Sequence, residues 1–160
     1  MALPFSVRLL GHATNSRVVN YLGAKNQKSG SKWTENPSCP PESVEQPYLR
    51  LGAHPNVVTR LWNNYAAALP ARCNWVVYGT PVLVNPGSAV IFACALGTCY
   101  AIRLPKDVQS EALELGLDTV HTYSNGEVLD LADLGDGWVF GHALTEEQRW
   151  CVRAFEYAGE

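Results

Sequence analysis

The stretch that decides the fold is residues 89–104, which read AVIFACALGTCYAIRL. Two apolar runs flank Gly97-Thr98, and a two-residue loop that begins with glycine is typical of a type II′ hairpin turn. Such a turn fixes the register, in which the opposite residues are Leu96 and Cys99, Cys94 and Ala101, and Phe92 and Arg103. The sequence therefore predicts an antiparallel hairpin here.

This register gives the two faces of the hairpin different characters. One face is apolar apart from a tyrosine hydroxyl, and it carries Ile91, Ala93, Ala95, Tyr100, Ile102 and Leu104. We expect it to be the core face, because successive side chains of a strand alternate between faces. Arg103 falls on the other face beside Phe92, where its stem covers a second apolar layer or its charged end lines a groove.

Helices and short strands are predicted on both sides of the hairpin in the sequence. The expected helices are 55–69, with apolar residues at three- and four-residue steps, 105–116, which opens with a proline, and 145–158, which opens with a capping box of Thr145 and Gln148. The expected strands are 74–79, 82–84, 120–123, 128–131 and 138–141. Tight turns rather than helical crossovers join them, which predicts an α+β fold in which an antiparallel sheet built from hairpins has its helices packed on one face.

The N-terminal third differs in composition from the rest of the chain. Residues 1–23 form a short segment in which 4–10 suggests a strand and 15–22 a helical turn. Residues 24–47 are rich in Ser, Pro, Asn, Gln and Lys, and such a segment buries too little apolar surface to offset its ordering entropy. We therefore expect a flexible linker or arm at 24–47 and a single compact domain at 48–160.

The charge pattern bears on the class of partner. The net charge of the chain is −3, and residues 48–160 hold seven Lys and Arg against twelve Asp and Glu. Nucleic-acid-binding domains carry a basic excess, because phosphate contacts supply most of their affinity. The acidic balance therefore argues against nucleic-acid binding and is compatible with a protein partner.

The five cysteines, Cys39, Cys73, Cys94, Cys99 and Cys151, are odd in number and irregular in spacing. This pattern is typical of buried free thiols in a reducing compartment. No apolar run is long enough for a membrane span, and no basic region precedes the first apolar residues. The cytoplasm is the expected location.

Two C-terminal stretches carry a resemblance to a known group of domains. These are GTCYAIRLPKDVQSEALELG at 97–116 and GDGWVFGHALTEEQRWCVRAFEYA at 135–158. The region of about 50–158 resembles the small YjbR/TfoX-N-like domains, in a pattern of strands and helices rather than a motif. The resemblance implies a small cytoplasmic α+β domain, without a shared catalytic residue, in a group of which some members are suspected of binding DNA or protein. The N-terminal extension and the acidic domain depart from that group.

No spacing in the chain predicts a metal site, a cofactor site or a catalytic group. Cys94 and Cys99 are diagonal neighbours in the hairpin, without a further His or Cys close in sequence to complete four zinc ligands. A Cys–His nucleophile requires the two side chains to meet in the fold, which spacing alone does not determine. The candidate binding surface is instead formed by aromatic and basic residues: Trp75, Tyr78, Arg103, Trp138 and His142.

The leading functional hypothesis is a non-enzymatic binding or regulatory module that acts through a protein partner. The alternative is a small enzyme or ligand-binding domain with a Cys/His site assembled by folding. A third hypothesis, weak nucleic-acid binding, depends on the resemblance alone. The sequence leaves the oligomeric state open.

Overall fold

The computed structural model describes residues 3–28, 32–41, 55–97, 99–123, 126–142 and 147–160. The α-helices are α1 (Phe5–Gly11), α2 (Ser16–Lys28), α3 (Pro55–Thr59), α4 (Lys106–Glu114) and α5 (Glu147–Ala158). The strands are β1 (Ser38–Cys39), β2 (Asn74–Val77), β3 (Thr80–Val84), β4 (Ile91–Leu96), β5 (Cys99–Arg103), β6 (Val120–Thr122), β7 (Val128–Asp130) and β8 (Trp138–His142). Short helical turns are η1 (Ala13–Asn15), η2 (Lys32–Glu35), the π-helical η5 (Arg60–Tyr65), η6 (Ala66–Ala68) and η7 (Leu131–Leu134).

The strands form a six-stranded antiparallel sheet in the order β1-β2-β3-β4-β5-β8, and β6 pairs with β7 in a small second sheet. The predicted α+β class with an antiparallel sheet is therefore confirmed. The helix expected at 55–69 is helical from Pro55 to Ala68, although its middle is a π-helix. The capping box at Thr145 lies outside the described residues.

The hairpin at the centre of the sheet has the predicted register, with one irregularity. Leu96 pairs with Cys99, and Cys94 pairs with Ala101. However, Leu83 of β3 pairs with Ala93, whereas Val84 pairs with Ile91, so Phe92 is an extra residue in a β-bulge. A bulge reverses the alternation of faces beyond it. The expectation that Ile91 shares a face with Ala93, and that Phe92 lies beside Arg103, is therefore wrong.

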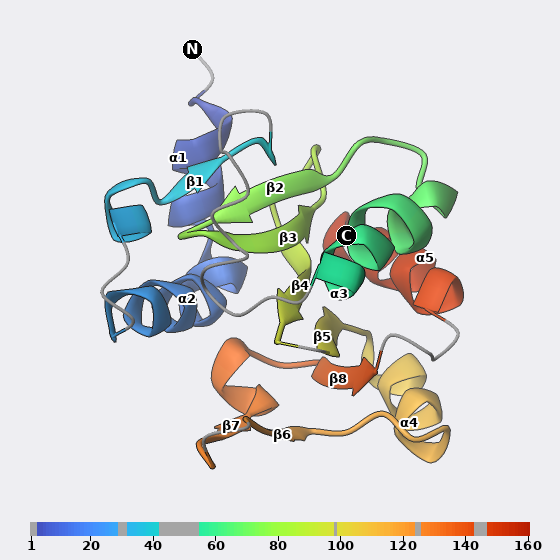
Figure 1. Cartoon of the computed structure of the whole chain (residues 1–160). Helices are drawn as coiled ribbons and strands as arrows, with labels where there is room; N and C mark the ends of the chain where they lie inside the picture. Colours follow the sequence, from blue (N-terminus) through green and yellow to red (C-terminus); the bar gives the residue numbers. More distant parts are fainter. Residues whose placement is uncertain (1–2, 29–31, 42–54, 98, 124–125, 143–146) are drawn as a thin grey trace.

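Helices cover both faces of the sheet, so the expectation that they pack on one face is also wrong (Figure 1). On one face α3, η5, α4 and α5 enclose a core that includes Phe92, Ile102 and Trp150. On the other face α1, α2 and η7 enclose a second core that includes Leu22 and Ile91. The physical reason lies in β3 and β4, where every residue is buried, because a strand that is apolar on both faces needs cover on both.

The N-terminal residues supply the second cover. Residues 4–10 were expected to form a strand, but Phe5–Gly11 is helical. The helical turn expected at 15–22 continues as α2 through Lys28, and Ser38–Cys39 pairs with β2. The described parts of the segment expected to be a flexible linker or arm, 24–47, therefore include the end of α2, η2 and β1. The mobility of this segment and the division into a domain at 48–160 stay predictions, and residues 42–54 lie outside the described residues.

Asn15 holds the N-terminal helices against the sheet. Its side chain is fully buried, and its Nδ2 donates to the carbonyl oxygens of Leu9 and Ala89, both at 2.8 Å. Its Oδ1 accepts from the N–H of Ile91 at 2.8 Å. One side chain thereby connects α1 to the start of β4.

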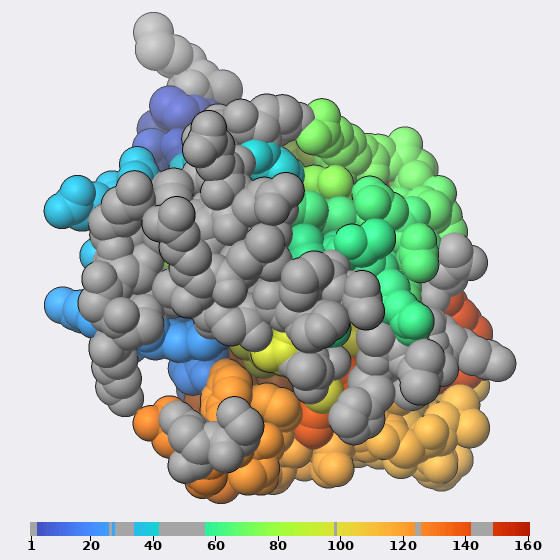
Figure 2. All heavy atoms as spheres, viewed as in Figure 1, coloured from blue at the N-terminus to red at the C-terminus, as the bar shows by residue number. Residues whose placement is uncertain are grey.

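Figure 2 shows the same view in space-filling form, with α2 at the left, in blue, and the β6-β7 segment at the lower edge, in orange. Within the described ranges, no helix combines the length and apolar character that crossing a lipid bilayer requires.

Candidate functional site

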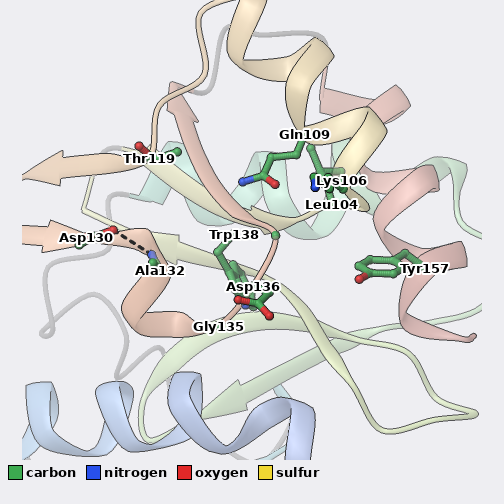
Figure 3. Close-up of a pocket in the computed structure, with 11 residues that line it drawn as sticks. Leu104, Lys106, Gln109, Thr119, Asp130, Ala132, Gly135, Asp136, Trp138 and Tyr157 are labelled. Carbon is green, nitrogen blue, oxygen red and sulfur yellow. Dashed lines mark hydrogen bonds between the residues drawn. The ribbon is translucent and has the colours of Figure 1, made fainter.

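A cavity of about 390 Å³ lies beside Trp138, where four parts of the chain meet. It is lined by Leu104, Lys106, Gln109, Thr119, Asp130, Ala132, Gly135, Asp136, Gly137, Trp138 and Tyr157. Figure 3 shows Lys106 and Gln109 reaching from α4 on one side of Trp138, with Asp130 and Tyr157 on either flank. This volume lies within the usual range of small-molecule sites.

The polar side chains of this cavity are placed by the ends of helices and strands. Pro105 precedes α4, which sets Lys106 and Gln109 on the first turns of that helix. Asp130 ends β7, and its Oδ1 accepts from the N–H of Ala132 at 3.0 Å, which caps η7. Tyr157 comes from the last turn of α5.

A close backbone contact forms one wall. The N–H of Leu104 donates to the carbonyl oxygen of Gly137 at 2.9 Å. Gly137 has a φ of +89°, and a Cβ there would lie 2.5 Å from the carbonyl oxygen of Leu104. Only glycine combines this conformation with this approach, so the predicted Asp136-Gly137 turn has a packing role next to the cavity.

Trp138 has an unsatisfied indole N–H beside the cavity. The side chain is only 2% exposed, and within the described part of the chain its Nε1 has no hydrogen-bond partner. The indole edge faces Gly135, whose Cβ position would be 3.6 Å from Nε1. Leaving a buried donor unpaired costs about 1–3 kcal/mol. Because Nε1 is buried, a ligand acceptor gains that energy where the backbone around Gly135 shifts to admit it.

The cavity presents charges of both signs. The ammonium of Lys106 faces a wall that also carries the carboxylates of Asp130 and Asp136. Behind Tyr157, the Arg103 guanidinium lies 4.2 Å from the centre of the tyrosine ring, in cation–π geometry. The cavity therefore offers both donors and acceptors around an aromatic wall.

The five residues of the predicted binding surface are not all brought together. Arg103 and Trp138 are direct partners on β5 and β8. Trp75 and Tyr78 belong to β2 and the turn after it, three strands away from β5, and both are partly buried in the second core. The ring of Trp75 packs 4.7 Å from that of Phe5. The backbone of His142 ends β8, and its side chain lies outside the described residues.

One Cys–His pairing appears in the backbone register. Cys99 of β5 lies opposite His142 of β8. Cys99 is buried, as are Cys73, Cys94 and Cys151, whereas Cys39 is partly exposed, and none of the five forms a disulfide. Burial raises the pKa of the Cys94 thiol to about 12, with nearby Lys25 opposing this rise.

A second polar cluster joins α2 to the β6-β7 region. The hydroxyls of Tyr21 and Tyr123 are hydrogen-bonded, and the His121 ring packs edge-on at 4.5 Å from the ring of Tyr123. Burial raises the pKa of both tyrosines and lowers that of Lys25. No spacing indicates this cluster, because its two halves are brought together only by the packing of α2 on the second face.

Sequence reasoning named Trp138 and Arg103 but missed Lys106, Gln109, Asp130 and Tyr157. The available signals were the proline before α4 and the Asp136-Gly137 turn, which mark element ends without showing that these ends converge.

Among the described residues, no three His, Cys, Asp or Glu side chains are grouped to hold a metal ion. The YjbR/TfoX-N-like resemblance stays a prediction. Comparison of the chain with protein-family models, with curated proteins and with solved structures gives no match.

Proposed function

We propose that this protein is a binding module that takes a small, hydroxylated ligand in the cavity beside Trp138. The observation that carries the proposal is the buried indole N–H without an acceptor, next to a cavity of ligand size. A ligand hydroxyl supplies that acceptor and, as a donor, also satisfies a carboxylate.

The mixed lining favours a neutral polyol or sugar over an apolar compound. Lys106 and Gln109 donate to ligand oxygens, and Asp130 and Asp136 accept from ligand hydroxyls. The ring of Tyr157 offers an apolar surface for the C–H groups of a sugar. Alternating donors and acceptors around an aromatic wall match the surface of a sugar.

The other functional hypotheses have less support in the fold. Action through a protein partner stays a prediction. Trp75 and Tyr78 lie at β2, four strands from Trp138 on β8 in the sheet order, and they do not line the cavity beside Trp138. A site centred on the Cys94 thiol is disfavoured by the raised pKa, which keeps the thiol protonated at neutral pH. Nucleic-acid binding also stays a prediction and gains no support from the acidic charge.

The test is a titration of the full chain with neutral sugars, including D-ribose and D-glucose, followed through the indole N–H resonances of the tryptophans. We expect the Trp138 resonance to shift, because its N–H becomes hydrogen-bonded. Trp138→Phe keeps an aromatic ring but lacks this donor, and should weaken binding roughly three- to tenfold, the worth of one hydrogen bond.

Two further variants separate recognition from folding. Gln109→Ala alters a side chain of the cavity at the helix surface and should also weaken binding. Trp75→Phe, outside the cavity, should leave the affinity unchanged. If the sugars shifted no Trp138 resonance, or if Trp75→Phe and Trp138→Phe weakened binding equally, the proposal would be wrong.

A further inference from the structure

A second cavity, of about 300 Å³, lies next to the first, and the two share Gly135 and Asp136. Its other walls come from η1, the start of α2 and the end of β5, with Thr14, Ser16, Arg17 and Arg103. A ligand in the cavity of Trp138 that extends past Gly135 therefore enters a space with two guanidinium groups.

We infer that the ligand of the Trp138 cavity carries a phosphate group, which binds between Arg17 and Arg103. This inference rests on the proposed function and names the chemical class of its ligand as phosphorylated sugars.

The two guanidinium groups are held by contacts that leave donors available. Nη1 of Arg17 donates to the carbonyl oxygen of Ala132 at 3.3 Å, and Arg103 stacks on Tyr157. A guanidinium has five N–H donors, so one hydrogen bond or a stacking contact leaves most of them for a phosphate. Among the residues that the structure describes, Arg149 pairs with Glu111 at 3.2 Å, whereas Arg17 and Arg103 take part in no such ion pair.

The charge and the hydroxyl groups of this cavity also suit phosphate. Two guanidinium groups face one carboxylate, that of Asp136, so the wall has a positive balance. Asp136 lies at the boundary between the cavities, where its oxygens accept from sugar hydroxyls on the side of Trp138. The hydroxyls of Thr14 and Ser16 can donate to further phosphate oxygens.

The contact between Arg103 and Tyr157 connects the two cavities. Tyr157 lines the first and Arg103 lines the second, and the guanidinium lies 4.2 Å from the ring centre. Guanidinium groups bind phosphate through charge-assisted hydrogen bonds, which are stronger than hydrogen bonds between neutral groups. Stacking on the ring keeps the Arg103 fork oriented, which reduces the entropy lost on binding.

The test compares D-ribose with D-ribose 5-phosphate, D-glucose with D-glucose 6-phosphate, and inorganic phosphate alone, on the full chain by calorimetry. We expect each phosphate ester to bind at least tenfold more tightly than its parent sugar. Arg17→Gln and Arg103→Gln should each remove about tenfold of ester affinity. Arg17 does not line the Trp138 cavity, so Arg17→Gln should leave the affinity for the neutral sugar unchanged. Arg153→Gln, an exposed residue of α5 outside both cavities, is the matched control and should change neither.

Arg103→Lys checks that the forked guanidinium of this side chain, rather than its charge, is required. Arg17 is exposed, so it can be replaced with little risk to folding. Esters that bound no more tightly than their parent sugars, or lost no affinity in the Arg17 and Arg103 variants, would overturn the phosphate inference alone. Inorganic phosphate that shifted the Arg17 and Arg103 side-chain resonances while no sugar shifted Trp138 would instead overturn the proposed function and leave an anion site.

Discussion

Burial sets the chemistry of the cysteine side chains. Cys73 and Cys94 have 1% and 0% exposure, and burial raises the pKa of each thiol to about 12. The thiolate is the reactive form, and a thiol with a pKa near 12 is ionised to only about one part in ten thousand at pH 8. Cys39 is partly exposed, and burial raises its pKa as well.

This difference predicts an order of alkylation in the native protein. With iodoacetamide at pH 8, Cys39 should react first, and Cys73 and Cys94 should react at least about a hundredfold more slowly, because they are both protonated and inaccessible. Mass spectrometry of peptides over a time course measures the three rates, and in denaturant the rates should converge. Rapid native labelling of Cys94 would contradict its burial and move the Cys/His hypothesis to first place.

At the scale of elements, the join between β5 and β8 depends on Gly137. Gly137 and Gly126 share a φ of +89°, but a Cβ at Gly126 meets nothing within 4 Å, whereas one at Gly137 meets the Leu104 carbonyl oxygen at 2.5 Å. The two glycines therefore separate the cost of the conformation from the cost of the contact.

We expect Gly126→Ala to lower the free energy of unfolding by about 1 kcal/mol, the cost of a left-handed alanine. Gly137→Ala should lower it by roughly 1–3 kcal/mol more, because Leu104 and the wall of the Trp138 cavity must shift. Chemical denaturation of both variants gives the difference. Equal losses would mean that the backbone contact does not constrain this join.

Some elements were predictable because their signals are local. Gly97-Thr98 fixes the turn of the central hairpin, and the pairing of Leu96 with Cys99 followed from it. The bulge at Phe92 was not predictable, because it depends on how β3 pairs with β4 from the other side. The candidate site could not be predicted from the sequence for the same reason, since Lys106, Asp130 and Tyr157 converge only in the folded chain.

At the scale of the whole molecule, the sheet is a central layer whose two faces are covered by different parts of the chain. The C-terminal helices and α3 cover one face, and α1 and α2 cover the other (Figure 1). The composition of the N-terminal residues suggested an extension outside the domain. Short helices such as Phe5–Gly11 owe their stability to the surface on which they pack, and composition does not reveal that surface. Arg17 also reaches the second cavity from α2, so this cover contributes to the proposed ligand site.

Asn15 tests whether the N-terminal helices are integral to the fold. Asn15→Ala removes the partner of the buried N–H of Ile91 and of the carbonyl oxygens of Leu9 and Ala89. Each buried group left unpaired costs about 1–3 kcal/mol, against a total stability of about 5–15 kcal/mol for a domain of this kind. We therefore expect a large fall in the urea midpoint for this variant. Asn20→Ala, at an exposed position of α2, should change the midpoint little or raise it slightly through the helix propensity of alanine. Equal midpoints for the two variants would mean that α1 and α2 detach from the sheet at little cost.

The part of the site that Arg17 contributes would then form only when a phosphorylated ligand holds α2 in place.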